Sequence, residues 1–145
     1  MRFIVPAVWI VLMIAIHLCF LVYKVNGDSM NPNLHNGEYG VAVRTTISQV
    51  DRFNVVIIST PEKYIIKRVI GLPGDTVCYA DGKLFINDEE VNDKWANGTT
   101  EDFYVELGNN EYFCLGDNRE HSTDSRWYGP FSKSSIKAVI IERGI

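Results

Sequence analysis

Ser29 is the first residue whose type and setting could support chemistry. It lies in residues 27–34, which read G-D-S-M-N-P-N-L. The Gly27-Asp28 pair is typical of a turn, and Pro32 restricts the residue before it to extended conformations. A serine on such a constrained, irregular segment is presented as a nucleophile would be. Most serines in turns have no catalytic role, so this segment alone leaves both interpretations open.

Lys67 and Arg68 are adjacent cations within an apolar stretch, Y-I-I-K-R-V-I, at residues 64–70. Side chains alternate between the two faces of a strand, so Lys67 shares its face with Ile65 and Val69, and Arg68 lies on the other. Burial lowers the pKa of a lysine by as much as about 3–5 units, whereas an arginine keeps its proton. Lys67 is therefore a candidate general base and Arg68 a structural ion-pair partner. A surface strand with two solvated charges is the plain alternative.

A third segment, residues 116–129, reads G-D-N-R-E-H-S-T-D-S-R-W-Y-G. It is dense in short hydrogen-bonding side chains and in charges of alternating sign. Such a loop can hold a site in place through many local bonds, with Arg–Asp pairs as the strongest of them. A solvated polar loop is the alternative.

The elements that must position these segments begin with an apolar run. Residues 3–23 contain no Asp, Glu, Lys or Arg, and about 20 apolar residues are enough to span a bilayer as a helix. The run is longer than the core of a cleavable secretory signal, and no A-x-A site follows it. We therefore expect an uncleaved membrane anchor over residues 1–24. A buried helix of a soluble protein is disfavoured, because a helix that is apolar on all sides needs a large protein around it.

The remainder, residues 25–145, predicts a mainly β domain. Short β-type runs are separated by turn residues, without a strong helical period. Asp81-Gly82 predicts a tight hairpin, and residues 87–101 predict an exposed loop. The expected strands are residues 39–43, 54–59, 63–70, 76–79, 83–86, 103–105, 112–115 and 137–141.

Charge and cysteine content exclude several classes of function. Beyond the apolar run the chain carries 13 basic and 18 acidic residues, so it has no electrostatic footprint for nucleic acid. Three cysteines do not make a disulfide framework, and Cys78 and Cys114 are expected to be buried thiols. The three histidines have no metal-ligand spacing with cysteines or carboxylates. We expect no metal and no cofactor.

Together, the three segments and their order resemble bacterial type I signal peptidases, in a short, Gram-positive-like form. The resemblance rests on S-M-x-P after the apolar run, on K-R-V-I-G-L-P-G-D and on G-D-N-R-x-x-S-x-D-S-R. It implies a single transmembrane helix followed by a compact, coiled antiparallel β-sheet or barrel-like catalytic domain. It also implies that Ser29 is the nucleophile and Lys67 the general base. Ser122 matches a serine that holds the lysine, Asp124 and Arg126 match its supporting ion pair, and Asp117 and Arg119 fall in the loop's scaffold.

The resemblance also implies a substrate and a location. The substrates would be signal peptides of secretory precursors, cleaved after small residues in an A-x-A pattern. The catalytic domain would face the extracytoplasmic side of the cytoplasmic membrane, in contact with its lipid. An extended substrate can pair with a strand edge and place alternate side chains in shallow pockets. The expected pocket residues are Val25, Met30, Leu34 and Ile66.

Two departures from the family pattern affect the site. Gly27 stands where many members carry a serine whose hydroxyl belongs to the oxyanion hole, so the oxyanion would rest mainly on backbone N–H groups, including that of Ser29. Asn33 replaces the usual threonine. Neither change removes a proton-transfer group, so activity is still expected.

Three other readings compete with this one. The first is a Ser-His-Asp triad of Ser29, Asp124 and either His121 or His35. The second is a self-cleaving repressor with a similar Ser/Lys pair, which would lack a membrane span and carry a DNA-binding segment. The third is an inactive homologue that serves as a membrane-tethered binding module. Retention of both Ser29 and Lys67 argues against the third.

Overall fold

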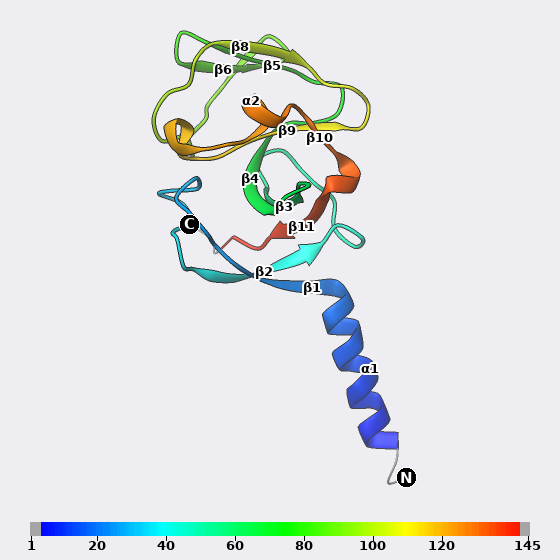
Figure 1. Ribbon diagram of the computed structural model, residues 1–145. Helices are drawn as coiled ribbons and strands as arrows, with labels where there is room; N and C mark the ends of the chain where they lie inside the picture. Colours follow the sequence, from blue (N-terminus) through cyan, green and yellow to red (C-terminus); the bar gives the residue numbers. More distant parts are fainter. Residues whose placement is uncertain (1–3, 143–145) are drawn as a thin grey trace.

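The structure is a computed structural model that describes residues 4–142. An N-terminal helix, α1 (Ile4–Cys19), leads directly into a mainly β domain (Figure 1). The strands are β1 (Phe20–Lys24), β2 (Tyr39–Arg44), β3 (Val55–Ser59), β4 (Tyr64–Gly71), β5 (Thr76–Ala80), β6 (Lys83–Ile86), β7 (Glu89–Val91), β8 (Phe103–Glu106), β9 (Glu111–Leu115), β10 (Phe131–Ser132) and β11 (Ile136–Ile140). Three short helical turns complete the domain: η1 (Arg119–His121), α2 (Ser125–Tyr128) and η2 (Lys133–Ser135).

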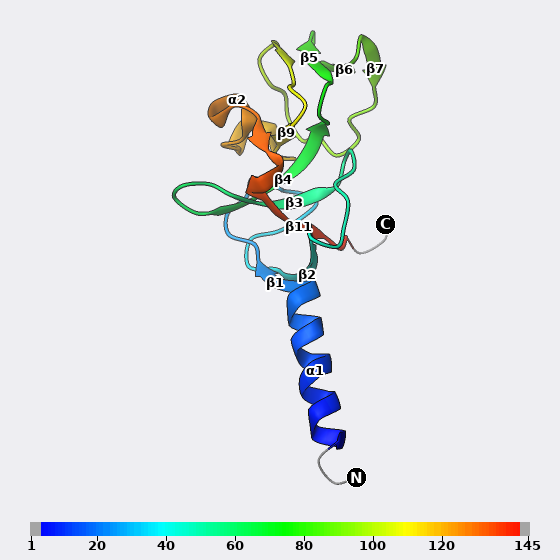
Figure 2. The ribbon, with the colours of Figure 1, turned by 90° about the vertical axis from the view of Figure 1, so that its right-hand side faces the viewer.

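Two antiparallel sheets build the domain. The larger sheet has seven strands in the order β1-β2-β11-β3-β4-β9-β10, and the smaller has four in the order β7-β6-β5-β8. Irregularities in the pairing of β11 with β3 and of β4 with β9 interrupt the ladder and increase its twist. The larger sheet consequently coils around its own core, and the smaller one lies at the end of the domain away from α1 (Figures 1 and 2). The expected mainly β fold is confirmed.

All eight expected strands are present, with ends that differ by at most one residue. The hairpin at Asp81-Gly82 is also present: β5 and β6 pair around it, and both residues have positive φ, of 49° and 75°. These are the values of the tight turn that matches the twist of a hairpin. Residues 87–101 differ from the expected exposed loop, because they contain β7 and bury the side chain of Asp93 to 7 % exposure.

The apolar N-terminal run differs from its prediction in one respect. The helix ends at Cys19, and Phe20–Lys24 forms β1, which pairs along its whole length with β2. Leu21 and Tyr23 pack toward a core cluster of the large sheet, while the alternate residues Phe20, Val22 and Lys24 are exposed. An unbroken apolar run hides this strand, because hydrophobicity alone does not separate a helix from a buried strand. Within the described residues, no helix is both long and apolar enough to cross a membrane.

Three apolar clusters form the core. One lies inside the coiled large sheet around β3, β4 and β9, and another fills the space between the two sheets. The third packs β2, β3 and β11 against Met30, the residue that follows Ser29. The segment of Ser29 is thus fixed to the core by its immediate neighbour, whose exposed fraction is 1 %. All three cysteines are free; Cys114 is buried in β9 as expected, whereas Cys78 in β5 is only half-buried.

Candidate active site

Ser29 lies in a compact turn between β1 and β2. Backbone N–H groups of Asn33 and Leu34 donate to the carbonyl oxygen of Met30, at 3.0 and 2.9 Å. Val25, which precedes the turn, exchanges backbone hydrogen bonds with the far end of the same loop, so the loop is closed at its base. Ser29 itself is half-buried. The constrained segment expected from the sequence is therefore built from local hydrogen bonds and one buried apolar anchor.

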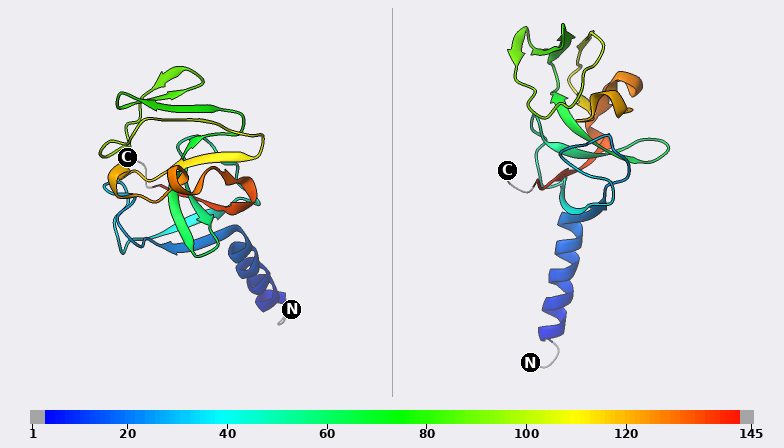
Figure 3. Two further views of the ribbon diagram at one scale, coloured as in Figure 1. Left: turned by 45° about the horizontal axis from the view of Figure 1, so that its top comes forward. Right: turned by 90° about the vertical axis from the view of Figure 1, so that its left-hand side faces the viewer.

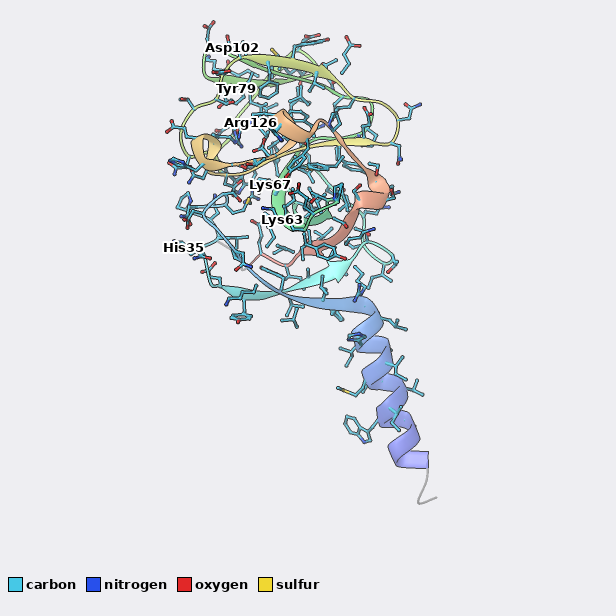
Figure 4. All side chains as sticks on the ribbon, in the orientation of Figure 1. His35, Lys63, Lys67, Tyr79, Asp102 and Arg126 are labelled. Atoms are coloured by element: carbon cyan, nitrogen blue, oxygen red, sulfur yellow. The ribbon has the colours of Figure 1, made fainter. Side chains whose placement is uncertain are left out.

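Lys67 lies in β4, and its Nζ atom is 2.8 Å from the Ser29 hydroxyl oxygen. The same nitrogen donates to the carbonyl oxygen of Ile66 at 2.8 Å. Only 3 % of Lys67 is exposed. Its pKa is lowered from 10.5 to about 8; burial is the largest cause and Lys63 adds to it, while the carboxylates of Asp124 and Asp117 oppose the shift only in part. In Figure 4 Lys67 lies inside the domain, whereas His35 lies at its periphery.

Arg68, on the opposite face of β4, is fully buried and has all of its donors engaged. Its Nε and Nη2 atoms donate to both oxygens of Asp117, at 2.9 and 2.8 Å. Glu142 accepts from Nη2 at 3.0 Å, and the carbonyl oxygen of Phe53 accepts from Nη1 at 2.8 Å. The guanidinium also lies 4.8 Å from the ring centre of Trp95. The expectation of a structural ion pair at Arg68 matches this geometry.

The loop that begins at Gly116 brings the remaining expected residues to the site. Asp124 is fully buried, accepts from the backbone N–H of Gly116 at 2.9 Å, and forms two bonds of 2.8 Å with Arg126. Burial opposes ionisation of Asp124, but these hydrogen bonds outweigh it and lower its pKa. Arg126 also donates to the Thr100 hydroxyl at 2.8 Å, so residues 87–101 brace this loop.

Gly116 is the tightest point of the site. A Cβ atom at this position would lie 2.1 Å from the Ser122 hydroxyl oxygen and 2.6 Å from the carbonyl oxygen of Ser29. Both distances are far inside van der Waals contact, and one of the two atoms belongs to the backbone. Only glycine therefore lets this loop lie directly against the nucleophile segment.

Ser122 is near the site but does not make the expected bond to Lys67. Its hydroxyl lies close enough to Asp124 to favour the ionised carboxylate, yet within residues 4–142 no atom meets the geometry of a hydrogen bond to it. The bonds of the Lys67 amine instead go to Ser29 and to the Ile66 carbonyl. The sequence placed Ser122 beside Lys67 by resemblance, and pattern alone cannot fix the rotamer of a hydroxyl.

Asn118 ties the loop to the nucleophile segment. Its backbone N–H donates to the carbonyl oxygen of Ser29 at 3.0 Å, and its side-chain amide donates to that of Asp28 at 3.1 Å. Sequence reasoning did not single out this residue. Its position two residues after Gly116, in a loop read as a scaffold, was the available signal.

A groove of about 590 Å³ opens at Ser29 and Lys67. Val25, Met30 and Ile66 line it, as expected, whereas Leu34 lies outside it in a separate pocket near β2 and the end of β11. Leu34 packs against the core cluster around Met30, and the turn that presents Ser29 carries it away from the groove. The expected four pocket residues are thus divided between two places.

One wall of the groove is a strand edge. β3 pairs with β4 from Tyr64 to Arg68, but β9 pairs with β4 only from Arg68 onward. Residues 64–66 therefore leave one edge of β4 open beside the groove. The β3–β4 hairpin that carries this edge projects from the body of the domain (Figures 2 and 3).

The backbone N–H of Ser29 has no acceptor among the described residues. It lies on the same residue as the hydroxyl that Lys67 contacts, so it is available to an oxygen that develops negative charge there. Gly27 adds no side chain; its N–H donates to the side chain of Asn36 at 3.0 Å.

The histidine alternatives do not match the geometry. His35 is exposed and lies 3.8 Å from Glu38, and the carboxylate of Asp124 is occupied by Arg126. His121 lines the groove, but within residues 4–142 the hydrogen bond to the Ser29 hydroxyl comes from Lys67. Over the same residues, no group of histidines, cysteines and carboxylates is arranged to hold a metal ion.

Comparisons with known proteins agree with this site. The sequence model of a family described as "Signal peptidase, peptidase S26" matches residues 1–143. Signal peptidase I S of Bacillus subtilis is 38 % identical over 150 residues, which cover 92 % of this chain and 80 % of the relative. Signal peptidase I V of the same species is 34 % identical over 140 residues, covering 83 % of each chain.

A solved structure supports the same assignment. The crystal structure of a signal peptidase I from Enterococcus faecalis V583 superposes with a TM-score of 0.61 at 31 % identity, over 66 % of this chain and 99 % of that one. Family match, sequence identity and fold therefore agree. The chain belongs to the signal peptidase family, peptidase S26, and is a serine peptidase.

Proposed function

We propose that this chain is a membrane-anchored endopeptidase that removes N-terminal signal peptides from exported precursors, with Ser29 as nucleophile and Lys67 as general base. The observation that carries the proposal is the 2.8 Å separation of Lys67 Nζ from Ser29 Oγ at a lysine that is 3 % exposed. A solvated lysine is almost entirely protonated near neutral pH, whereas one with a pKa of about 8 has a substantial neutral fraction. Burial thus supplies the basicity that the chemistry needs.

The mechanism follows from these two groups. Neutral Lys67 accepts the proton of the Ser29 hydroxyl as its oxygen bonds to the carbonyl carbon of the substrate. The negative charge on the carbonyl oxygen is stabilised by the Ser29 N–H. When the C–N bond breaks, the lysinium gives the proton to the leaving amine and leaves an acyl-enzyme. A water molecule, deprotonated by Lys67 in turn, then releases the carboxylate and regenerates the serine.

The groove supports an extended peptide as the substrate. The open edge of β4 at residues 64–66 offers backbone groups to an added strand. Val25, Met30 and Ile66 give the groove apolar walls beside the serine. Such shallow pockets suit small side chains at alternate substrate positions, which is the A-x-A pattern.

The proposed location places the helix α1 in the cytoplasmic membrane and the β domain outside it; the boundary falls before β1 rather than after residue 24, because β1 is paired with β2. The family is membrane-associated in bacteria, and every described residue from Val8 to Ile14 is exposed in the helix α1. A tether at the bilayer raises the effective concentration of the enzyme near membrane-inserted precursors.

The test is cleavage of a precursor with an A-x-A site by the full chain in detergent, at pH 7 and pH 9. Wild type should cut once, after the second small residue, and faster at pH 9. Lys67→Ala should abolish cleavage, while His121→Ala should retain it. Loss of activity in His121→Ala with retention in Lys67→Ala would establish a histidine base instead. No cleavage by wild type at either pH would favour an inactive, membrane-tethered binding module.

A further inference from the structure

We propose that Asn33 is a positioning residue, which holds the segment of Ser29 in register with the strand of Lys67. This inference rests on the proposed Ser29/Lys67 chemistry. Asn33 lies four residues after Ser29, in the same turn, and its backbone N–H is bonded to Met30. Its side chain leaves the turn and reaches two other parts of the protein.

The side-chain nitrogen of Asn33 makes two hydrogen bonds. It donates to the Oδ2 atom of Asp117 at 2.9 Å and to the carbonyl oxygen of Trp95 at 3.1 Å. Trp95 is 62 positions and Asp117 is 84 positions after Asn33 in the sequence, and one side-chain amide joins both of them to the nucleophile segment. An amide NH₂ has two hydrogens, so both bonds can be made at once.

The bond to Asp117 continues toward Lys67. Both oxygens of Asp117 accept from Arg68, and Arg68 directly follows Lys67 in β4. Asp117 and Arg68 each have a side-chain exposure of 0 %. Two contacts, Asn33–Asp117 and Asp117–Arg68, therefore connect the turn of Ser29 to the strand of Lys67. The second contact is a buried, bidentate ion pair, which has a fixed geometry.

The hydrogen bond from Asn33 to Trp95 gives a second connection to Arg68. The Trp95 ring faces the guanidinium of Arg68 at 4.8 Å and packs against the Phe53 ring, with ring centres 4.6 Å apart and ring planes tilted by 34°. Both partners of Asn33 are thus in contact with Arg68. A shift of the Ser29 turn along β4 would have to break both bonds.

A threonine, the residue expected here from the family pattern, has one hydroxyl hydrogen and can donate only one of these bonds. Leucine is close to asparagine in size and can donate neither. Asn33→Thr and Asn33→Leu therefore remove one and two bonds in turn, without changing the Lys67 environment directly. Misplacement of reacting groups by about 1 Å is enough to reduce a rate 10²-fold.

The experiment measures kcat and KM of the full chain in detergent with the A-x-A precursor, across pH 6–10 and well below each Tm. For Asn33→Leu we expect kcat to fall about 10- to 100-fold with KM within about twofold of wild type. Asn33→Thr should lie between the two. The midpoint of the pH profile should stay near its wild-type value, because the burial of Lys67 is retained and only its alignment with Ser29 changes.

Val77→Ala is the matched stability control. Val77 is fully buried in β5, within the cluster between the sheets and away from the groove. It should lower Tm while leaving kcat unchanged. If Asn33→Leu does not fold, Asn33→Thr carries the test through the same kcat measurement.

Three outcomes overturn the inference. One is an Asn33→Leu or Asn33→Thr enzyme, folded at the assay temperature, whose kcat equals that of wild type. Another is a loss of rate accompanied by a shifted pH midpoint, which would show that the site has opened to water. In both cases wild type still cleaves and the proposed function stands. The third is failure of wild type to cleave, which removes the proposed function and the inference together.

Discussion

The two faces of β4 bury adjacent basic side chains, but their surroundings favour opposite charge states. Lys67 is desolvated, its amine meets a hydroxyl and a carbonyl, and its pKa falls to about 8. Arg68, equally buried, is held by the carboxylates of Asp117 and Glu142. Burial therefore does not decide the charge of a side chain by itself. The presence or absence of a carboxylate partner, and the intrinsic pKa of the group, decide it.

The largest expected effect is the loss of activity when Lys67 is replaced by a side chain that stays protonated. Lys67→Arg keeps a cation but cannot lose its proton, so it should be as inactive as Lys67→Ala. Loss of a general base costs about 10²–10⁴-fold in rate. Turnover of the A-x-A precursor, with far-UV circular dichroism to confirm folding, measures this. An active Lys67→Arg enzyme would contradict the distinction between the faces.

Next in size is the removal of the partner on the Arg68 face. Asp117→Ala leaves a buried guanidinium short of one carboxylate, and breaking such a pair costs about 3–5 kcal/mol of the free energy of unfolding. The exposed pair of Lys83 and Glu90 provides the control: Glu90→Ala should cost about 0–1 kcal/mol. Urea denaturation of both variants compares them. Equal losses of stability in the two variants would mean that a buried cation depends no more on its carboxylate partner than an exposed one does.

The pH dependence of stability gives an effect of intermediate size. Since the pKa of Lys67 is about 8 in the folded protein and 10.5 in its ordinary state, the unfolded chain binds more protons between these values. The free energy of unfolding should therefore rise with pH across this window, by about 3 kcal/mol, as the cost of burying the ammonium disappears. Below pH 8 that cost is fully present. The difference between wild type and Lys67→Met measures it, and a difference that does not vary from pH 8 to 10.5 would show that Lys67 is not desolvated.

The smallest effect is expected at Ser122. Its buried hydroxyl has no hydrogen-bond partner among the described residues, so Ser122→Ala should not lower the free energy of unfolding by more than about 0.5 kcal/mol. Ser125 is the contrasting serine of the same loop, because its hydroxyl accepts from the buried N–H of Cys114 at 2.9 Å. Ser125→Ala should cost about 1–3 kcal/mol. A reversed order would show that Ser122 is bonded in solution.

Sequence alone located eight of the described strands, all except β1, β7 and β10, and the segments of Ser29 and Lys67, because these depend on local patterns and on long motifs. The alternation around Lys67 and Arg68 predicted two faces, and the structure contains them. β1 was missed because its apolar residues continue an apolar helix without a turn signal. The orientation of the Ser122 hydroxyl and the position of Leu34 depend on rotamers and on loop direction, which no local pattern specifies.

Ion-pair partners that are distant in the sequence could not be predicted either. Glu142 reaches Arg68 from the end of the chain, and Asp93 pairs with Arg119 from within residues read as an exposed loop. Charged residues are common in loops and near chain ends, so their type gives no indication of a partner. Only the fold shows that residues 87–101 brace the loop that follows Gly116.

The strand β1 has a mechanical consequence. Ser29 lies ten positions after Cys19, where α1 ends, so the two residues are no more than about 35 Å apart. Half of that length is β1, whose pairing with β2 attaches it to the large sheet. In the proposed membrane setting, Ser29 would therefore lie at a fixed distance from the bilayer surface. The number of polar residues that follow a precursor's apolar segment would then determine which of its peptide bonds reaches Ser29.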